Sequence, residues 1–116
     1  SAKARGGVQP VVTLKANGGA KAVVRAGQRV NFVTTIAVPP GTGKVVGAEW
    51  DFDGSGKFAE KSALKAAQSV TLKASHVFAR PGTYFVAMRA YSHRTGNMTS
   101  PYARIPNIGR VRVVVR

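Results

Sequence analysis

The sequence contains no cysteine, and this absence removes three kinds of site at once. A chain without thiols forms no disulfide, no zinc–thiolate centre and no cysteine nucleophile. Its stability must therefore come from the packing of apolar residues, which make up 44% of the 116 residues. A chain of this length folds as one domain and buries about 65% of the surface that its unfolded form exposes.

Acidic residues are almost as scarce. Only four Asp and Glu residues stand against 18 Lys and Arg residues, which gives a formal charge of +14. A sequence pI near 11.5 predicts attraction to polyanions such as acidic polysaccharides, membrane surfaces or nucleic acids. The basic residues are nevertheless spread along the chain, with one tight cluster in the C-terminal "GRVRVVVR" (109–116). Because nucleic-acid binding requires a basic patch together with a recognisable motif, the sequence does not favour nucleic acid as the partner.

Long apolar runs are missing as well. No stretch approaches the roughly 18 residues that a transmembrane helix needs, so we expect no transmembrane segment. The chain opens with "SAKARGGVQ" (1–9), which lacks both a methionine and the apolar centre of a signal peptide. We therefore interpret residues 1–9 as a flexible linker, and the chain as a segment cut from a longer polypeptide.

What the sequence does contain is a series of short β-branched and aromatic runs, separated by Gly, Pro and Asn. Their apolar–polar alternation predicts about seven strands, namely residues 10–16, 21–27, 29–38, 44–52, 68–74, 83–91 and 109–116. This spacing predicts an all-β fold, a single antiparallel β-sandwich of residues 10–116. Residues 57–68 favour helix by composition but lack an apolar stripe, so we expect a loop with one turn or an extra edge strand there.

Two segments resemble the polycystic-kidney-disease (PKD) domain family, "EWDFDGSGKF" (49–58) and "SHVFARPGTYFVAMRAY" (75–91). The first segment matches the family's Trp-x-Phe element at Trp50 and Phe52, although "DGSG" stands where Gly-Asp-Gly is commoner. The second segment matches at His76, Phe78 (in place of Tyr), Pro81, Gly82, Thr83, Tyr84 and Val86. The resemblance implies an immunoglobulin-like β-sandwich over essentially the whole chain.

The alternation and the motifs together predict the centre of the core. Trp50 faces inward and supplies the bulk that fills a two-sheet interior. Tyr84 starts a later strand, where its ring can be buried while its hydroxyl bonds to the backbone. The predicted structural core comprises Trp50, Phe52, Phe78, Tyr84 and Val86.

The acidic residues are concentrated in one stretch. Asp51, Asp53 and Ser55 occupy the first, third and fifth positions of a pattern that resembles a calcium loop. The twelfth position is Ser62 instead of the bidentate Glu, and two carboxylates are a poor cage for a cation that takes six to eight oxygens. We therefore expect Glu49, Asp51 and Asp53 to line the outward face of a strand, with Asp53 capping the turn. A calcium site at Asp51 and Asp53 stays as the alternative.

No set of residues forms a recognisable catalytic group. The chain lacks the G-x-S-x-G pattern, and neither His76 nor His93 has a carboxylate near it in sequence that would orient its ring. We expect no active site and no enzymatic activity in this segment.

The predicted strand 83–91 offers the one candidate binding surface. Phe85, Arg89 and Tyr91 alternate on its outward face, and Tyr102 and Arg104 follow nearby in sequence. Exposed aromatic rings beside guanidinium groups are typical of interface cores and of sugar-stacking platforms. The alternative is that another strand or a loop of the same domain covers these rings.

The resemblance implies a non-catalytic accessory module of a larger bacterial protein, which can be a hydrolase. It also implies a secreted, periplasmic or cell-surface location and a role in spacing, docking or contact with protein or carbohydrate. Other domains of the parent protein are then the first partners to expect. The alternative function is a polyanion-binding module that uses the charge of +14.

Overall fold

The computed structural model describes residues 9–97 and 104–116, and these residues form strands, turns and loops without a helix. The strands are β1 (Val11–Ala16), β2 (Lys21–Val24), β3 (Arg29–Ala37), β4 (Lys44–Asp51), β5 (Glu60–Lys61), β6 (Ser69–Val77), β7 (Gly82–His93) and β8 (Ile105–Val115). The expectation of an all-β sandwich is confirmed. The segment with helical composition contributes the short edge strand β5, one of the two outcomes expected for it.

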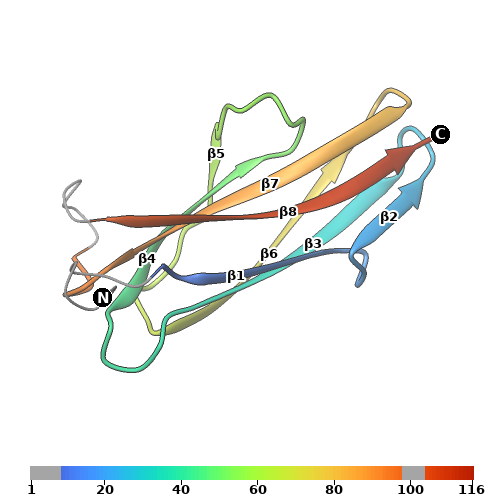
Figure 1. The fold of residues 1–116 in the computed structure, drawn as a ribbon. Helices are drawn as coiled ribbons and strands as arrows, with labels where there is room; N and C mark the ends of the chain where they lie inside the picture. Colours follow the sequence, from blue (N-terminus) through green and yellow to red (C-terminus); the bar gives the residue numbers. More distant parts are fainter. Residues whose placement is uncertain (1–8, 98–103) are drawn as a thin grey trace.

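The strands form two sheets, and Figure 1 shows them stacked as an elongated sandwich. The first sheet has three strands in the order β1-β3-β6, and the second has five in the order β2-β8-β7-β4-β5. The sheets are thus unequal in width, because β2 and β5 extend the second sheet on its two sides. The chain changes sheet between β1 and β2, between β2 and β3, between β3 and β4, and on either side of β6.

One strand pair differs from the antiparallel expectation. β2 runs parallel to β8, with Lys21 opposite Arg112 and Val24 opposite Val115. The turn after β1 moves the chain to the other sheet without reversing its general direction, as Figure 1 shows. Asn17 holds this kink, because its side-chain oxygen accepts the Asn31 N–H and its own N–H donates to the Asn31 carbonyl.

Alternation along the strands places the core between the sheets. In β3, every second residue from Val30 to Ile36 is fully buried, while Val33 between them is exposed. The one polar member of this row, Thr34, donates its hydroxyl to the Thr13 carbonyl at 2.8 Å, which satisfies it inside the core. The facing sheet contributes Val86, Met88, Ala90, Val111 and Val113.

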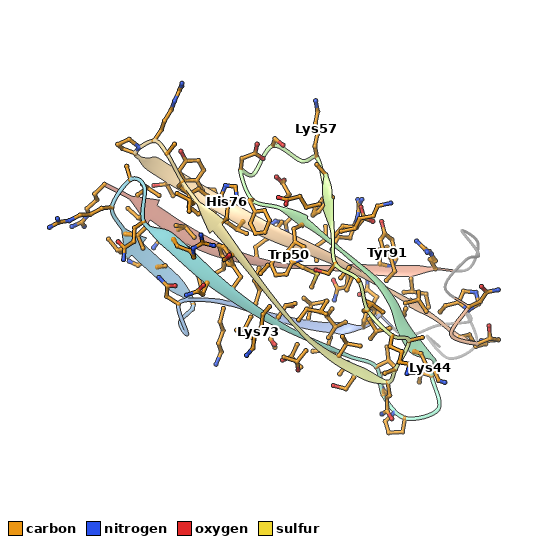
Figure 2. All side chains as sticks on the ribbon, turned by 180° about the vertical axis from the view of Figure 1, so that it is seen from behind. Lys44, Trp50, Lys57, Lys73, His76 and Tyr91 are labelled. Atoms are coloured by element: carbon orange, nitrogen blue, oxygen red, sulfur yellow. The ribbon has the colours of Figure 1, made fainter. Side chains whose placement is uncertain are left out.

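A chain of aromatic rings runs through this core. Its neighbouring ring centroids lie 4.6–6.1 Å apart, in the order Phe32, Trp50, Phe52, His76, Phe78 and Tyr84. Figure 2 shows Trp50 and His76 in the space between the sheets. Of the predicted core residues, Trp50, Phe52, Phe78 and Val86 are buried and Tyr84 is half-buried. The Trp50 indole N–H donates a hydrogen bond to the Ser62 hydroxyl, and the Tyr84 hydroxyl donates one to the Arg80 carbonyl.

Phe32→Ala should lower the free energy of unfolding by about 3–5 kcal/mol, because it removes a fully buried ring that contacts both Trp50 and Phe52. Val33→Ala is the matched control on the same strand, and its side chain points to solvent, so we expect a change within about 0.5 kcal/mol. Denaturant titration followed by tryptophan fluorescence measures both. An equal decrease in the free energy of unfolding for the two variants would show that the chain of rings does not stabilise the core.

Candidate functional site

Asp51 lies at the centre of the acidic region, where the structure corrects the sequence interpretation. Its side chain is 97% buried, whereas we expected it on an open outward face. One oxygen accepts the N–H groups of Gly54 and Ser55, and the other accepts the N–H of Gly56 at 2.7 Å. The turn after β4 therefore folds over the carboxylate and covers it. The main cap of this turn is Asp51, and not Asp53 as expected.

Asp53 is exposed and makes a smaller contribution to the same turn. It accepts the Ser55 N–H at 3.2 Å. A hydrogen bond with the Asp51 carboxyl, together with those from Ser55, lowers the pKa of Asp53 below its usual value.

This arrangement does not suit a calcium ion. Calcium requires a shell of oxygen atoms, whereas the Asp51 oxygens face three N–H groups, whose positive ends would repel a cation. Within residues 9–97 and 104–116, no three His, Cys, Asp or Glu side chains lie together in a way that could hold a metal. The carboxylate of Asp51 closes a turn, and we do not propose a metal here.

Glu49 belongs to a second cluster on the outer face of the five-stranded sheet. It pairs with Arg89, its neighbour across the β4–β7 ladder, at 3.3 Å. The Arg89 guanidinium lies 4.2 Å from the Phe58 ring centre and 5.5 Å from that of Tyr91. Arg104 approaches the same Tyr91 ring at 5.2 Å. Desolvation, followed by the hydrogen bond and charge of Glu49, raises the pKa of Tyr91.

Three of the predicted binding residues, Arg89, Tyr91 and Arg104, are thus brought together by the fold. Their partners come from the same domain, since Glu49 and Phe58 cover Arg89 from β4 and from the following loop. For Arg89, the structure therefore agrees with the alternative that a strand or a loop of the same domain covers the predicted binding residues. Tyr102 lies outside the described residues.

Phe85 lies apart from this cluster and is open to solvent. Its side chain is 56% exposed, and Arg112 faces it across the β7–β8 ladder. Lys21 on β2 pairs with the other side of Arg112. The next row along these strands consists of Thr83, Val114 and Val23, of which Val23 is 48% exposed.

These strands together form an exposed surface, on which apolar side chains lie beside cationic ones. We call it the Phe85 face, and it comprises Lys21, Val23, Phe85, Arg110, Arg112 and Val114. The six residues of the face carry no carboxylate; on β4, Asp51 is buried and Glu49 pairs with Arg89. The exposed Asp53 precedes Gly54, which lies against the Phe85 backbone. The three cationic side chains of the face thus exceed this one carboxylate.

The sequence identified Phe85 as a binding candidate, but it did not show which residues of other strands lie beside it. The alternation in "GRVRVVVR" (109–116) puts Arg110 and Arg112 on the face opposite to Val111 and Val113, so it predicts that the two Arg side chains point outward. That Arg112 lies beside Phe85, and Lys21 beside Arg112, depends on the strand register and on the parallel pairing of β2.

The two sheets, with β4, β7 and β8 in one and β3 and β6 in the other, define an immunoglobulin-like β-sandwich. The model of the PKD domain family matches residues 12–100, and the chain belongs to this family. A solved structure with a similar fold is the PKD domain of an M14-like peptidase from Thermoplasmatales archaeon SCGC AB-540-F20. It has a TM-score of 0.66 and 16% sequence identity, and the alignment covers 94% of this chain and 97% of that one. None of the curated proteins matches the chain.

The family match confirms the resemblance to PKD domains that residues 49–58 and 75–91 indicate. PKD domains are non-catalytic modules of larger proteins, usually extracellular or secreted ones. In the part of the chain that the structure describes, no helix is long and apolar enough to cross a membrane.

Asp51→Asn should destabilise the domain by about 2 kcal/mol, because it replaces a buried carboxylate that accepts three N–H groups by an amide with only one accepting oxygen. Asp53→Asn is the matched control at an exposed position and should leave the unfolding midpoint nearly unchanged. Chemical denaturation at neutral pH measures both variants. A larger loss for Asp53→Asn than for Asp51→Asn would contradict the assignment of the cap.

The phenol of Tyr91 should titrate above its ordinary pKa of 10.0. Glu49→Gln should lower the pKa of Tyr91 without restoring the ordinary value, because desolvation, the larger cause, remains. The difference in phenolate absorbance between the native chain and its Tyr91→Phe variant gives the pKa, and the same difference is then measured in the Glu49→Gln background. A Tyr91 pKa that is unchanged by Glu49→Gln would remove Glu49 as a cause.

Proposed function

We propose that the chain is a non-catalytic accessory module of a larger secreted or cell-surface protein, which contacts a protein or carbohydrate through the Phe85 face. The parent can be a hydrolase, and the similar PKD domain of a peptidase supports this kind of parent. The fold likeness by itself says nothing about the ligand, so the proposal depends on the chemistry of the surface.

The exposure of Phe85 is the observation that carries this proposal. The Phe85 side chain is 56% exposed, so water hydrates much of an apolar ring in the free domain. A partner that covered the ring would gain the free energy of burying it. Val23 and Val114 extend the apolar area around it, and Arg112 lies directly beside it. Aromatic and Arg side chains are enriched at the centres of protein interfaces, and an aromatic ring also stacks on the apolar face of a sugar.

The exposure of side chains along three neighbouring strands also supports a contact role. Strands β2, β8 and β7 present alternate side chains on one broad surface, so that neighbouring groups lie about 5 Å apart across the ladder. Such a surface fits the surface of another protein or an extended glycan. It offers no enclosed space in which a small substrate would be held away from water.

A second candidate function is the binding of polyanions such as acidic polysaccharides or anionic membrane surfaces. The distribution of charge favours it, because all four acidic residues lie between Glu49 and Glu60 while the formal charge of the chain is +14. In this case Lys21, Arg110 and Arg112 would provide the binding and Phe85 would contribute little. The two candidates therefore differ in their dependence on salt and on the ring.

Phe85→Ala and Arg112→Gln distinguish the two functions in binding assays on a panel of neutral polysaccharides, heparin and polygalacturonate. If the module docks through the Phe85 face, binding to one neutral glycan persists above about 0.2 M salt and falls about tenfold or more with Phe85→Ala. If it binds polyanions, binding is restricted to the acidic polymers, disappears by about 0.2 M salt and depends on Arg112 more than on Phe85.

Val33→Ala and Lys15→Gln are the matched controls, since both positions are exposed on the outer face of the other sheet. Loss of binding in these controls to the same degree would place the contact elsewhere. For a protein partner, the same four variants are compared in binding to the other domains of the parent protein. Retention of full binding by Phe85→Ala in every assay would contradict the proposal.

A further inference from the structure

Strand β6 forms one edge of the three-stranded sheet and has no strand on its other side among the described residues. It is nine residues long and pairs with β3 along its whole length. Figure 2 shows β6 crossing the near side of the molecule, with Lys73 on it and His76 close to its C-terminal end. A long edge strand is a template for pairing with another extended chain.

The register identifies which backbone groups of β6 are available. The Val38 N–H donates to the Gln68 carbonyl, and these two residues come one position beyond the last pair of the β3–β6 register, Ala37 opposite Ser69. Bonded pairs recur at every second position in an antiparallel ladder, so the even-numbered residues of β6 bond to β3. On the other side of β3, Asn31 bonds to Asn17 next to β1, which agrees with this alternation. The residues of β6 that direct their N–H and C=O groups away from β3 are Ser69, Thr71, Lys73, Ser75 and Val77.

The interior of the sandwich is also incompletely covered along β6. The inward-facing side chains of β6 are only partly buried, although those opposite them on β3 are fully buried; they are Val70, Leu72, Ala74 and His76. Beside His76, a hollow of about 250 Å³ reaches Trp50 and Phe52. The wider five-stranded sheet thus extends past β6, and a fourth strand in the smaller sheet would cover these apolar side chains.

Charge selects the kind of strand that fits. Lys73 is the outward charged residue of β6, and it lies in one row with Val33 and Lys15 on the same face. None of the three strands of this sheet contains an acidic residue. An acidic side chain on an added strand would therefore be attracted to the outer face. On the inner side, Asp53 and Glu60 line the hollow and would repel an acidic side chain of the added strand.

A second copy of this chain does not have the required chemistry. Two antiparallel β6 strands paired about their centre would place the two Lys73 side chains near each other, and like charges at facing positions are destabilising. Each copy also carries a formal charge of +14. The added strand must therefore come from a different protein or domain.

We propose that β6 binds an extended segment of a partner protein in which apolar residues alternate with Asp or Glu. Its backbone continues the ladder of the three-stranded sheet at Thr71, Lys73 and Ser75. Its apolar side chains face inward onto Leu72 and Ala74, and its carboxylates face outward toward Lys73. This site lies on a different sheet from the Phe85 face, so it is independent of the function proposed above.

The test uses the isotope-labelled chain and a heptapeptide of alternating Glu and Val, with blocked ends. In the free chain, the amides of Thr71, Lys73 and Ser75 should exchange with solvent faster than those of Leu72 and Ala74, which bond to β3. When peptide occupies about 90% of the chain, exchange at these three amides should slow about tenfold by mass action. The same peptide with a central proline cannot continue the ladder and should protect none of them.

Lys73→Glu tests the charge selection. This variant should bind the Glu/Val peptide about tenfold more weakly and should bind a Lys/Val peptide more tightly than the native chain does, because it reverses the sign of the facing pairs. Lys15→Glu is the matched control, since it makes the same change in the same row but on the other edge strand. It should alter binding by about twofold at most.

Three results would overturn the proposal. The first is an unchanged exchange rate at Thr71, Lys73 and Ser75 in the presence of saturating peptide. The second is equal weakening by Lys15→Glu and Lys73→Glu, which would indicate attraction to overall charge only. The third is concentration-dependent dimerisation of the free chain that protects the same amides, which would make a second copy the occupant of β6.

Discussion

The contact between aromatic rings across the two sheets is the interaction on which the rest of the structure depends. Phe32 from the smaller sheet meets Trp50 from the larger one, Phe52 stacks on His76 at 4.7 Å, and Phe78 meets Tyr84 at 4.6 Å. The ring chain therefore crosses between the layers repeatedly. Because there is no cysteine to join the sheets, this packing has to fix their separation and orientation.

The acidic residues serve this scaffold, which leaves basic and apolar groups for contact. Asp51 closes the turn after β4, and Glu49 holds Arg89 against the same sheet. Among the open surfaces of the described residues are the Phe85 face on the larger sheet and the edge of β6 on the smaller one. The two regions that we propose for contact lie on different sheets, an arrangement that suits a module joining parts of a larger assembly.

Much of the fold follows from local pattern, and the errors arise where a turn folds back over a strand or where distant segments meet. Alternation correctly indicated the buried row of β3, and the aromatic motifs indicated Trp50 and Phe52. The same alternation placed Asp51 on an outward face, and it failed because the next turn folds back over that face. Phe85 was identified as a binding candidate from one strand, but alternation along a single strand says nothing about which residue of another strand lies beside it.

The sequence by itself determined the fold class, the family and the inward positions of the main core rings, because these depend on periodicity and on short motifs that act over a few residues. The tertiary structure decided the burial of Asp51, the insertion of His76 between Phe52 and Phe78, the parallel pairing of β2, and the neighbourhood of Phe85 and Arg112. The burial of Asp51 depends on a local turn, whose N–H groups three to five residues further along bond to the carboxylate. The other three features depend on strand register or on a turn that crosses between sheets. Both join residues far apart along the chain, and their energies depend on the packing of the whole sandwich.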